Sequence, residues 1–159
     1  MKILIVSDTH RQINGFKKVI DKVAPIDLVV HCGDSEGTEE SFARIAGCPV
    51  EMVSGNNDFM STLPREKEFM IGRYKVWLTH GHKYFVTVEG MTIRREAVAR
   101  SIDILMYGHT HKPVVEIMPD LIAINPGSLN YPRQEGRRCS FIIMDIDKNG
   151  EAHFTVNYL

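Results

Sequence analysis

Five short apolar runs in this chain each lead into aspartate, asparagine or histidine side chains, and this repeated junction constrains the fold most strongly. Lys2–Val6, for example, is apolar after its first residue and is followed by Ser7 and Asp8. A run of this length without polar alternation is typical of a strand buried on both faces. In an open α/β sheet, ligands bind beyond the carboxyl ends of the strands. The polar side chains that follow the five runs are therefore expected to lie together: Asp8, His10, Asp34, Asn56, His80, His109 and His111.

Helical patterns separate the first three apolar runs. Apolar residues recur at helical spacing from Phe16 to Val23, Pro25 stops that helix, and a second short helix is expected over 39–46. The strands that these helices connect are expected over 2–6, 27–31 and 49–53. This order of strands and helices predicts parallel strands joined by right-handed crossovers.

The second half of the chain changes character, with strands that follow one another closely. Gly72 and Gly150 mark two hairpin turns. Strands are expected over 68–71, 75–79, 104–107, 114–117, 121–124, 139–146 and 151–158, and a helix over 91–100 with Ile93, Ala97 and Val98 as its buried stripe. The whole pattern predicts an α/β fold of two mixed β-sheets packed face to face with helices outside, in a single domain over 1–159.

Composition is that of an ordinary globular protein and narrows the choice of partners. The chain has 159 residues, a formal net charge of −1, 43% hydrophobic residues and 25% charged residues. It has no strong positive field that would favour nucleic acid or a membrane surface. Its three cysteines are far apart and form no CxxC motif, which is typical of reduced thiols in the cytoplasm. No apolar stretch approaches the length of a spanning helix, so a cytoplasmic protein is expected.

The residue types at the five junctions favour metal binding. His109-Thr-His111 is the strongest single motif, because two imidazoles in one glycine-led loop rarely serve a core. Asp-x-His and Gly-Asp are weaker taken singly, since Gly-Asp after a strand is as often a turn. Carboxylate, amide and imidazole ligands without thiolate favour Mn, Ni, Fe, Zn or Co. Seven ligands are too many for one tetrahedral ion but suit two ions that share a carboxylate.

Taken together, the motifs resemble those of a known family. The ordered set D8-T-H10, G33-D34, G55-N56-N57-D58, H80-G-H82 and G108-H109-T-H111 is similar to that of calcineurin-like metallophosphoesterases, and spans residues 5–128. The short length and the segment Ile124–Ser128 resemble the small YfcE-type phosphodiesterase branch. The resemblance implies a four-layer αββα sandwich. It also implies one metal ion, Mn most readily, on Asp8, His10, Asp34 and His111, and a second ion on Asp34, Asn56, His80 and His109.

The same resemblance implies a reaction: in-line attack of a metal-bridging hydroxide on a small phosphodiester. Asp34 would bridge the ions, and His109 or His82 would offset charge on the phosphate oxygens. Many family members have histidine where this chain has Asn57. An amide donates a hydrogen bond but cannot act as a general acid near pH 7. We therefore expect activity biased towards diesters with good leaving groups. Asp58 keeps its family position without the usual imidazole partner.

Other side chains near these motifs have a functional and a structural interpretation. His82 has two interpretations of equal weight: it contacts the phosphate, or it is a loop imidazole hydrogen-bonded to the backbone. Arg11 either contacts a phosphate oxygen or is a solvated surface arginine, and the second interpretation has about twice the weight of the first. His31 is expected to be a hydrogen-bonded core histidine, and His153 a structural residue of the last strand.

Three further groups of residues are expected to have structural roles. Residues 125–128 are expected to form a tight loop that positions the sheet ends near the site. Arg133, Arg137 and Arg138 form either a phosphate-attracting rim or a solvated turn, and the turn is preferred. The cysteines, Cys32, Cys48 and Cys139, are expected to be buried apolar fillers without a catalytic partner.

Two rival functions remain open at this stage. A degenerate phosphoesterase fold can serve as a scaffold for a protein partner, but every metal ligand of the family is present here. A nuclease is disfavoured because the chain lacks the basic surface that holds a polynucleotide. A homo-oligomer, a dimer or a tetramer, is expected only because relatives often form one.

Overall fold

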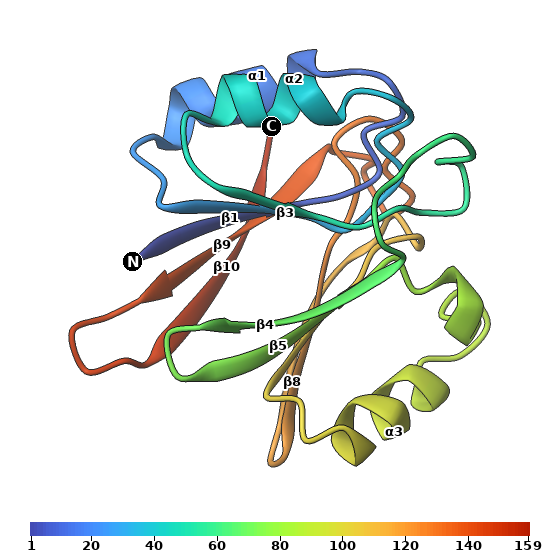
Figure 1. Cartoon of the computed structure of the whole chain (residues 1–159), viewed down its shortest axis with the longest axis vertical. Helices are drawn as coiled ribbons and strands as arrows, with labels where there is room; N and C mark the ends of the chain where they lie inside the picture. Colours follow the sequence, from blue (N-terminus) through green and yellow to red (C-terminus); the bar gives the residue numbers. More distant parts are fainter.

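Two five-stranded β-sheets lie face to face in the computed structural model, which describes residues 1–159 (Figure 1). The strand order in the first sheet is β10-β9-β1-β2-β3. Its strands are β1 (Lys2–Val6), β2 (Leu28–His31), β3 (Val50–Met52), β9 (Ser140–Ile146) and β10 (Ala152–Tyr158). The first three are parallel, as expected from the crossovers, and β9 is antiparallel to both β1 and β10.

The second sheet has the strand order β4-β5-β6-β8-β7. Its strands are β4 (Glu66–Ile71), β5 (Tyr74–Thr79), β6 (Ile104–Met106), β7 (Pro113–Met118) and β8 (Leu121–Pro126). Strands β5, β6 and β8 are parallel, while β4 and β7 are antiparallel edge strands. Each sheet thus contains three parallel strands, and these strands deliver their carboxyl ends to the loops on one side of the sandwich (Figure 1).

Helices cover the outer faces of the sandwich. Figure 1 shows α1 (Asn14–Val23) and α2 (Glu39–Ala46) over the first sheet and α3 (Met91–Ala99) beside the second. A short 3₁₀ helix, η1 (His82–Tyr84), follows β5. The four-layer αββα sandwich expected from the sequence is confirmed, and no helix is long and apolar enough to cross a membrane.

Side-chain alternation along the buried strands builds the core in three layers. In β1, Ile3 and Ile5 face the second sheet, while Leu4 and Val6 face α1 and α2. Because both faces of the strand are covered, all four side chains are apolar, and no polar alternation appears in the sequence. A third cluster around Trp77 packs between the second sheet and α3.

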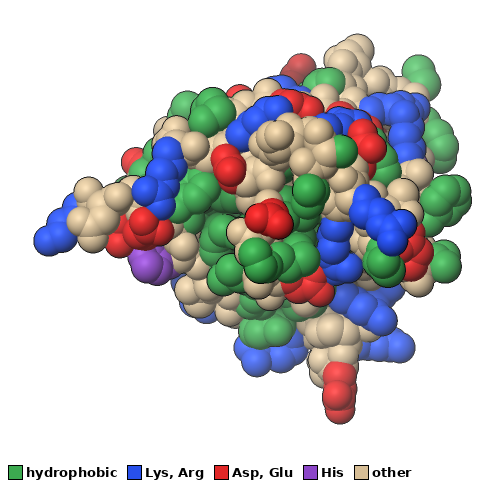
Figure 2. All heavy atoms as spheres, turned by 90° about the horizontal axis from the view of Figure 1, so that it is seen from below, with side chains coloured by type: hydrophobic (Ala, Val, Ile, Leu, Met, Phe, Trp, Pro, Cys, Tyr) green, Lys and Arg blue, Asp and Glu red, His purple; other side chains and the backbone are tan.

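Several expected boundaries differ from the observed ones. Helix α3 ends at Ala99, and Val98, expected in its buried stripe, is 49% exposed, whereas Ile93 and Ala97 are buried. Residues Asn125 and Pro126 belong to β8 and pair with β7, because the β7–β8 hairpin extends to the Pro113–Pro126 pair. On the face seen in Figure 2, Lys and Arg side chains lie among Asp and Glu side chains, so this face shows no continuous basic patch.

His31 ends β2 and is fully buried against Phe42 of α2, with ring centroids 4.7 Å apart. Its Nδ1 accepts a hydrogen bond from the Gly33 N–H at 3.1 Å, so Nε2 carries the proton and lies 3.1 Å from Thr9 Oγ1. It is the core histidine that the sequence predicts. Burial lowers the pKa of His31 to about 4.

Since the unfolded chain protonates this imidazole near pH 6.5 and the folded chain only near pH 4, protonation favours unfolding between these values. We expect the free energy of unfolding to fall by about 3 kcal/mol from this group as the pH drops from 6.5 to 4. His31→Asn keeps an acceptor for Gly33 and does not titrate. Urea unfolding at several pH values should show a flatter pH profile for the variant, and parallel profiles would contradict the assignment.

Candidate metal centre

The seven side chains predicted as metal ligands lie in the loops at the carboxyl ends of the parallel strands. Asp8, Asp34, His80 and His111 are buried, while the other three are partly exposed. Two groups have ligand atoms close enough to bind one cation each: Asp8, His10 and His111, and Asp8, Asp34 and His80. Each group combines residues from loops of both sheets.

Backbone conformation in these loops is unusual for residues with side chains. Five of the predicted ligands have positive φ angles: Asp8 (53°), His10 (43°), Asp34 (59°), His109 (67°) and His111 (57°). Such a conformation costs a non-glycine residue of order 1 kcal/mol or more and persists only where the surroundings enforce it. Paired backbone hydrogen bonds between the first two loops provide this support, from Asp8 N to Gly33 O and from His10 N to Asp34 O, each 3.0 Å.

Glycine is required in three of the loops because another ligand lies against the backbone. A Cβ atom on Gly55 would lie 2.1 Å from Asp34 Oδ1, and one on Gly33 would lie 2.8 Å from His80 Nδ1. A Cβ atom on Gly108 would lie 2.1 Å from Ser7 Oγ and 2.9 Å from Asp8 Oδ2. The Gly-Asp, Gly-Asn and Gly-His pairs of the sequence are thus spatial requirements of the site, not simply turns.

Hydrogen bonds on the outer ring nitrogens set the orientation of three histidines. His10 Nδ1 lies 2.7 Å from Glu36 Oε1, His80 Nδ1 lies 2.8 Å from Cys32 O, and His111 Nδ1 lies 2.6 Å from Tyr131 O. These partners only accept hydrogen bonds, so each Nδ1 carries the hydrogen and the neutral ring presents a lone pair at Nε2. This arrangement is the one that orients imidazoles towards a metal ion.

The three Nε2 atoms converge on carboxylate oxygens without hydrogen atoms between them in the neutral rings. His111 Nε2 lies 3.0 Å from Asp8 Oδ1 and 3.4 Å from His10 Nε2. His80 Nε2 lies 3.4 Å from Asp34 Oδ2 and 3.1 Å from Asn56 Oδ1. Asp8 Oδ1 is buried and accepts no hydrogen bond. Lone pairs packed this closely repel one another unless a metal cation or a proton lies between them, and the set of nitrogen and oxygen ligands fits divalent metal ions.

Both carboxylates are ionised at neutral pH, as metal binding requires. Burial raises the pKa of Asp8, but hydrogen bonding and charge attraction from protonated His111 and His80 outweigh it and lower that pKa overall. Burial likewise opposes ionisation of Asp34, and the His80 imidazole together with two hydrogen bonds from Asn57 lowers its pKa below the usual range. Asp8 Oδ2 also accepts from Ser7 Oγ at 2.6 Å and from His109 N at 3.1 Å.

Most of the closely spaced ligand atoms follow the expected metal spheres, because Asp8, His10 and His111 form one group and Asp34 and His80 lie together in the other. Asp34 was expected to be the shared carboxylate, whereas here Asp8 belongs to both groups and Asp34 lies with His80. Asn56 lies beside His80, as expected. The His109 ring lies near the His80 ring, with centroids 5.1 Å apart, but outside both groups.

The predicted catalytic side chains surround these ligands. Asn57 donates from Nδ2 to Asp34 Oδ2 at 2.6 Å and from its backbone N–H to Asp34 Oδ1 at 2.9 Å, so it orients the carboxylate. The ring centroids of His82 and His109 are 6.1 Å apart, and the buried Nδ1 of His82 has no hydrogen-bond partner. Burial, together with His80 and His109, lowers the pKa of His82 to about 4, so this ring is neutral at pH 7.

Asp58, Asn125 and Ser128 hold the loops together through hydrogen bonds that the sequence did not specify. The Asp58 carboxylate accepts hydrogen bonds from the backbone N–H groups of Asp34 at 2.8 Å and Gly55 at 2.7 Å. Ser128 Oγ donates to Asp8 O at 2.8 Å, and Asn125 Nδ2 donates to Gly108 O at 2.8 Å. The expected positioning role of 125–128 thus has a physical basis, and the order of the motifs was the only signal for Asp58.

The remaining candidate residues lie either beside the metal centre or on the surface away from it. Arg11 is 78% exposed and forms an ion pair with Glu36 at 3.0 Å. Arg133 and Arg137 are exposed, as a solvated turn predicts, yet they also line a cavity with His10 and His111. The remaining candidates lie elsewhere: Arg138 over the Tyr158 ring, His153 exposed beside Asp147, Cys32 buried, and Cys48 and Cys139 partly buried.

Comparison with known proteins adds independent support for the family. The sequence model of the calcineurin-like phosphoesterase superfamily domain matches residues 1–149. A probable metallophosphoesterase of Methanocaldococcus jannaschii is 33% identical over 138 residues, 84% of this chain and 70% of the relative. A phosphodiesterase of the same organism is 31% identical over 145 residues, 80% of this chain and 83% of the relative. The crystal structure of a predicted phosphoesterase from Streptococcus pneumoniae is 30% identical, with a TM-score of 0.82 over 99% of this chain and 88% of that one.

The close approach at Gly55 gives a direct test of the site. In Gly55→Ala the new methyl group would overlap Asp34 Oδ1, so we expect metal affinity to fall roughly 10- to 100-fold, as for loss of other supporting residues. Gly90→Ala is the control, because its methyl group meets only the flexible end of Arg94. Calorimetric titration with Mn²⁺ measures both variants. Unchanged affinity in Gly55→Ala would show that Asp34 is not a ligand.

Proposed function

This chain belongs to the calcineurin-like phosphoesterase superfamily, and we propose that it hydrolyses small phosphodiesters with two divalent metal ions. The observation that carries the proposal is the convergence of three imidazole lone pairs on two buried carboxylates. His111 Nε2 and Asp8 Oδ1 are 3.0 Å apart, and His80 Nε2 and Asp34 Oδ2 are 3.4 Å apart. A divalent cation between the two atoms, or a proton on the imidazole, stabilises each approach.

The ions would be held by the seven residues predicted from the sequence: Asp8, His10, Asp34, Asn56, His80, His109 and His111. Nitrogen and oxygen ligands without thiolate suit Mn²⁺ first, with Ni, Fe, Zn or Co as alternatives. When bound, such ions supply Lewis-acid activation of water and neutralise charge on the phosphate. Whether Asp34 or Asp8 is the shared carboxylate in the loaded protein is part of the proposal, and Asp8 is favoured by its place in both groups.

The protein's own side chains would orient the phosphate and stabilise its developing charge. His82 is neutral at pH 7 and has an unpartnered ring nitrogen, so it can donate a hydrogen bond to a phosphate oxygen in one tautomer. His109 lies beside His80 and can act in the same way, since burial lowers its pKa and favours the neutral ring.

We propose direct in-line attack of water on phosphorus. Cys32, the thiol in the second ligand loop, is fully buried, and burial raises its pKa well above the usual value, so it is unsuited as a nucleophile. Ser7 Oγ is buried and donates to Asp8. Asn57 stands where relatives often have an acid, so the leaving group must depart without a proton from this position. This favours diesters with acidic leaving groups.

Two wider expectations belong to the same proposal. The three cysteines are free thiols, which supports a cytoplasmic location. A small diester rather than a polynucleotide is preferred, because the net charge is −1.

Metal reconstitution tests the function. Apo protein loaded with Mn²⁺, Ni²⁺ or Zn²⁺ should bind two ions and hydrolyse bis(p-nitrophenyl) phosphate faster than p-nitrophenyl phosphate, and chelation should abolish both activities. Hydrolysis of a chiral oxygen-labelled diester should invert the configuration at phosphorus. Two bound ions with no activity on any ester would favour the scaffold for a protein partner, and retention at phosphorus would indicate a phospho-enzyme.

The Asn57 position allows a second test, on leaving-group dependence. Asn57→His introduces a group that can be protonated near neutral pH, so it should raise turnover on diesters with poor leaving groups by roughly 10- to 100-fold. Diesters of p-nitrophenol should change little. Asn57→Gln, which adds length without an acid, is the matched control for lost contacts with Asp34. The same leaving-group slope in Asn57→His and the natural protein would remove this position from the reaction.

A further inference from the structure

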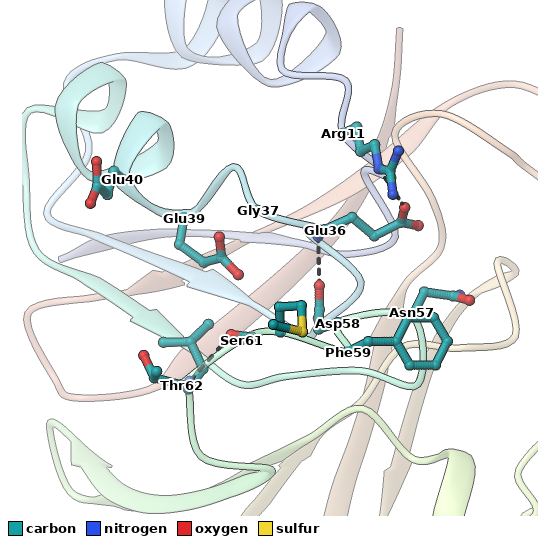
Figure 3. Close-up of a pocket in the computed structure, with 12 residues that line it drawn as sticks. Arg11, Glu36, Gly37, Glu39, Glu40, Asn57, Asp58, Phe59, Ser61 and Thr62 are labelled. Carbon is teal, nitrogen blue, oxygen red and sulfur yellow. Dashed lines mark hydrogen bonds and ion pairs between the residues drawn. The ribbon is translucent and has the colours of Figure 1, made fainter.

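A cavity of about 430 Å³ adjoins the metal centre on the side of the Asn57 loop (Figure 3). We call it the Phe59 pocket and define it by Arg11, Glu36, Glu39, Asn57, Phe59 and Met60, which are among its lining residues. Its volume lies within the usual range for small-molecule sites. None of the metal ligands lines this cavity, and Asn57 is its one lining residue with a role in the proposed reaction.

The Phe59 pocket is joined to the metal centre through two of its walls. Glu36 contacts the His10 ring at 2.7 Å, and Asn57 donates to Asp34 at 2.6 Å. A phosphodiester bound at the centre has two ester groups, and one of them can extend past these residues into the cavity. The pocket is therefore placed to select one ester group of the substrate.

One wall of the pocket is an apolar lip that lacks a partner within the chain. Phe59 is 85% exposed and Met60 is 95% exposed. They follow Asp58, whose carboxylate is held by backbone N–H groups of the ligand loops, and Ser61 N donates to Asp58 O at 3.2 Å. The lip is thus anchored at a buried residue while its aromatic ring is free to stack on a planar group.

The opposite wall accepts hydrogen bonds. Glu39 begins α2, and its Oε1 atom is buried without a hydrogen-bond partner. Figure 3 shows its carboxylate turned into the cavity. Glu36 is already paired with His10 and Arg11, so the unpaired carboxylates of this wall are Glu39 and the exposed Glu40. A free carboxylate in this wall repels an anionic group and favours one with N–H donors.

The other side of the metal centre has the opposite character. There Arg133 and Arg137 line a separate cavity with His10 and His111. A substrate with one charged and one uncharged end would meet cationic side chains on that side and the aromatic and carboxylate walls on this side.

We propose that the Phe59 pocket binds a nucleobase that presents N–H donors, as one ester group of a nucleotide diester. Phe59 stacks on the base, Met60 covers its edge, and Glu39 accepts its N–H hydrogen bonds. Guanine fits best, because its N1–H and its amino group lie on one edge and match the two oxygens of a carboxylate. The inference rests on the proposed hydrolysis and names the substrate class for the same site.

Equilibrium binding separates this inference from turnover. Guanosine 5′-monophosphate and ribose 5-phosphate share a phosphate and a sugar, and only the first has a base. Titration calorimetry on the Mn²⁺-loaded protein should give about tenfold tighter binding of guanosine 5′-monophosphate, as expected for one stacked base. Phe59→Ala should remove most of this preference without changing the affinity for ribose 5-phosphate. Val88→Ala removes an equally exposed apolar side chain elsewhere and should keep the preference.

Glu39→Gln tests the hydrogen-bonding wall. It replaces one acceptor oxygen by a donor, so the affinity for guanosine 5′-monophosphate should fall roughly fivefold and that for ribose 5-phosphate should stay. Phosphocholine, a phosphate with a cationic end, is the competing probe.

Equal affinities for the nucleotide and ribose 5-phosphate, or tighter binding of phosphocholine, would overturn the assignment of a base. Hydrolysis of simple diesters, together with equal affinities for the nucleotide and ribose 5-phosphate, would contradict the base-binding pocket but not the proposed hydrolysis. Binding that depends on the base, without hydrolysis of any ester, would contradict the proposed hydrolysis but not the base-binding pocket.

Discussion

The burial of two ionised carboxylates against inward-facing imidazole lone pairs is the constraint on which the rest of this structure depends. Asp8 and Asp34 are almost inaccessible to water, and burying a charge without a partner costs several kcal/mol. The histidines cannot supply that partner as neutral donors, because their N–H groups point outward to Glu36 Oε1, Cys32 O and Tyr131 O. The loops are therefore arranged so that a cation fits between these groups.

This constraint explains the strained backbone around the site. Ligand atoms from five loops reach a common volume only if the chain turns sharply directly after each strand, which places residues such as Asp8 and His109 at positive φ. The hydrogen bonds that hold these turns come from Asp58 and Ser128, which are not ligands. The energy cost of the turns is thus offset by the surrounding framework, as is usual where strain serves a binding site.

The sequence predicted the layers and the ligand loops because both leave a local pattern. Uninterrupted apolar runs identify strands covered on both faces, and polar residues at their ends identify the loops. The partners of Asp8 could not be predicted, since Ser128 is separated from it by 120 residues and carries no local signal. Val98 was misplaced because successive residues of a helix differ by about 100° in direction, so Val98 points away from the face of Ala97 and is exposed. The Phe59 pocket was not foreseen, because the exposure of an apolar residue depends on which loops surround it.

The division of ligands between the two sheets has a mechanical consequence. Asp8 and Asp34 leave the first sheet and His80 and His111 leave the second, and each candidate cation contacts both. Such an ion would be a cross-link between the two sheets at the edge where the parallel strands end. Depletion of metal would then weaken the attachment of the two sheets to each other and also abolish the proposed hydrolysis. The half-life of the folded protein in a cell would therefore be longer when metal ions are abundant and shorter when they are scarce.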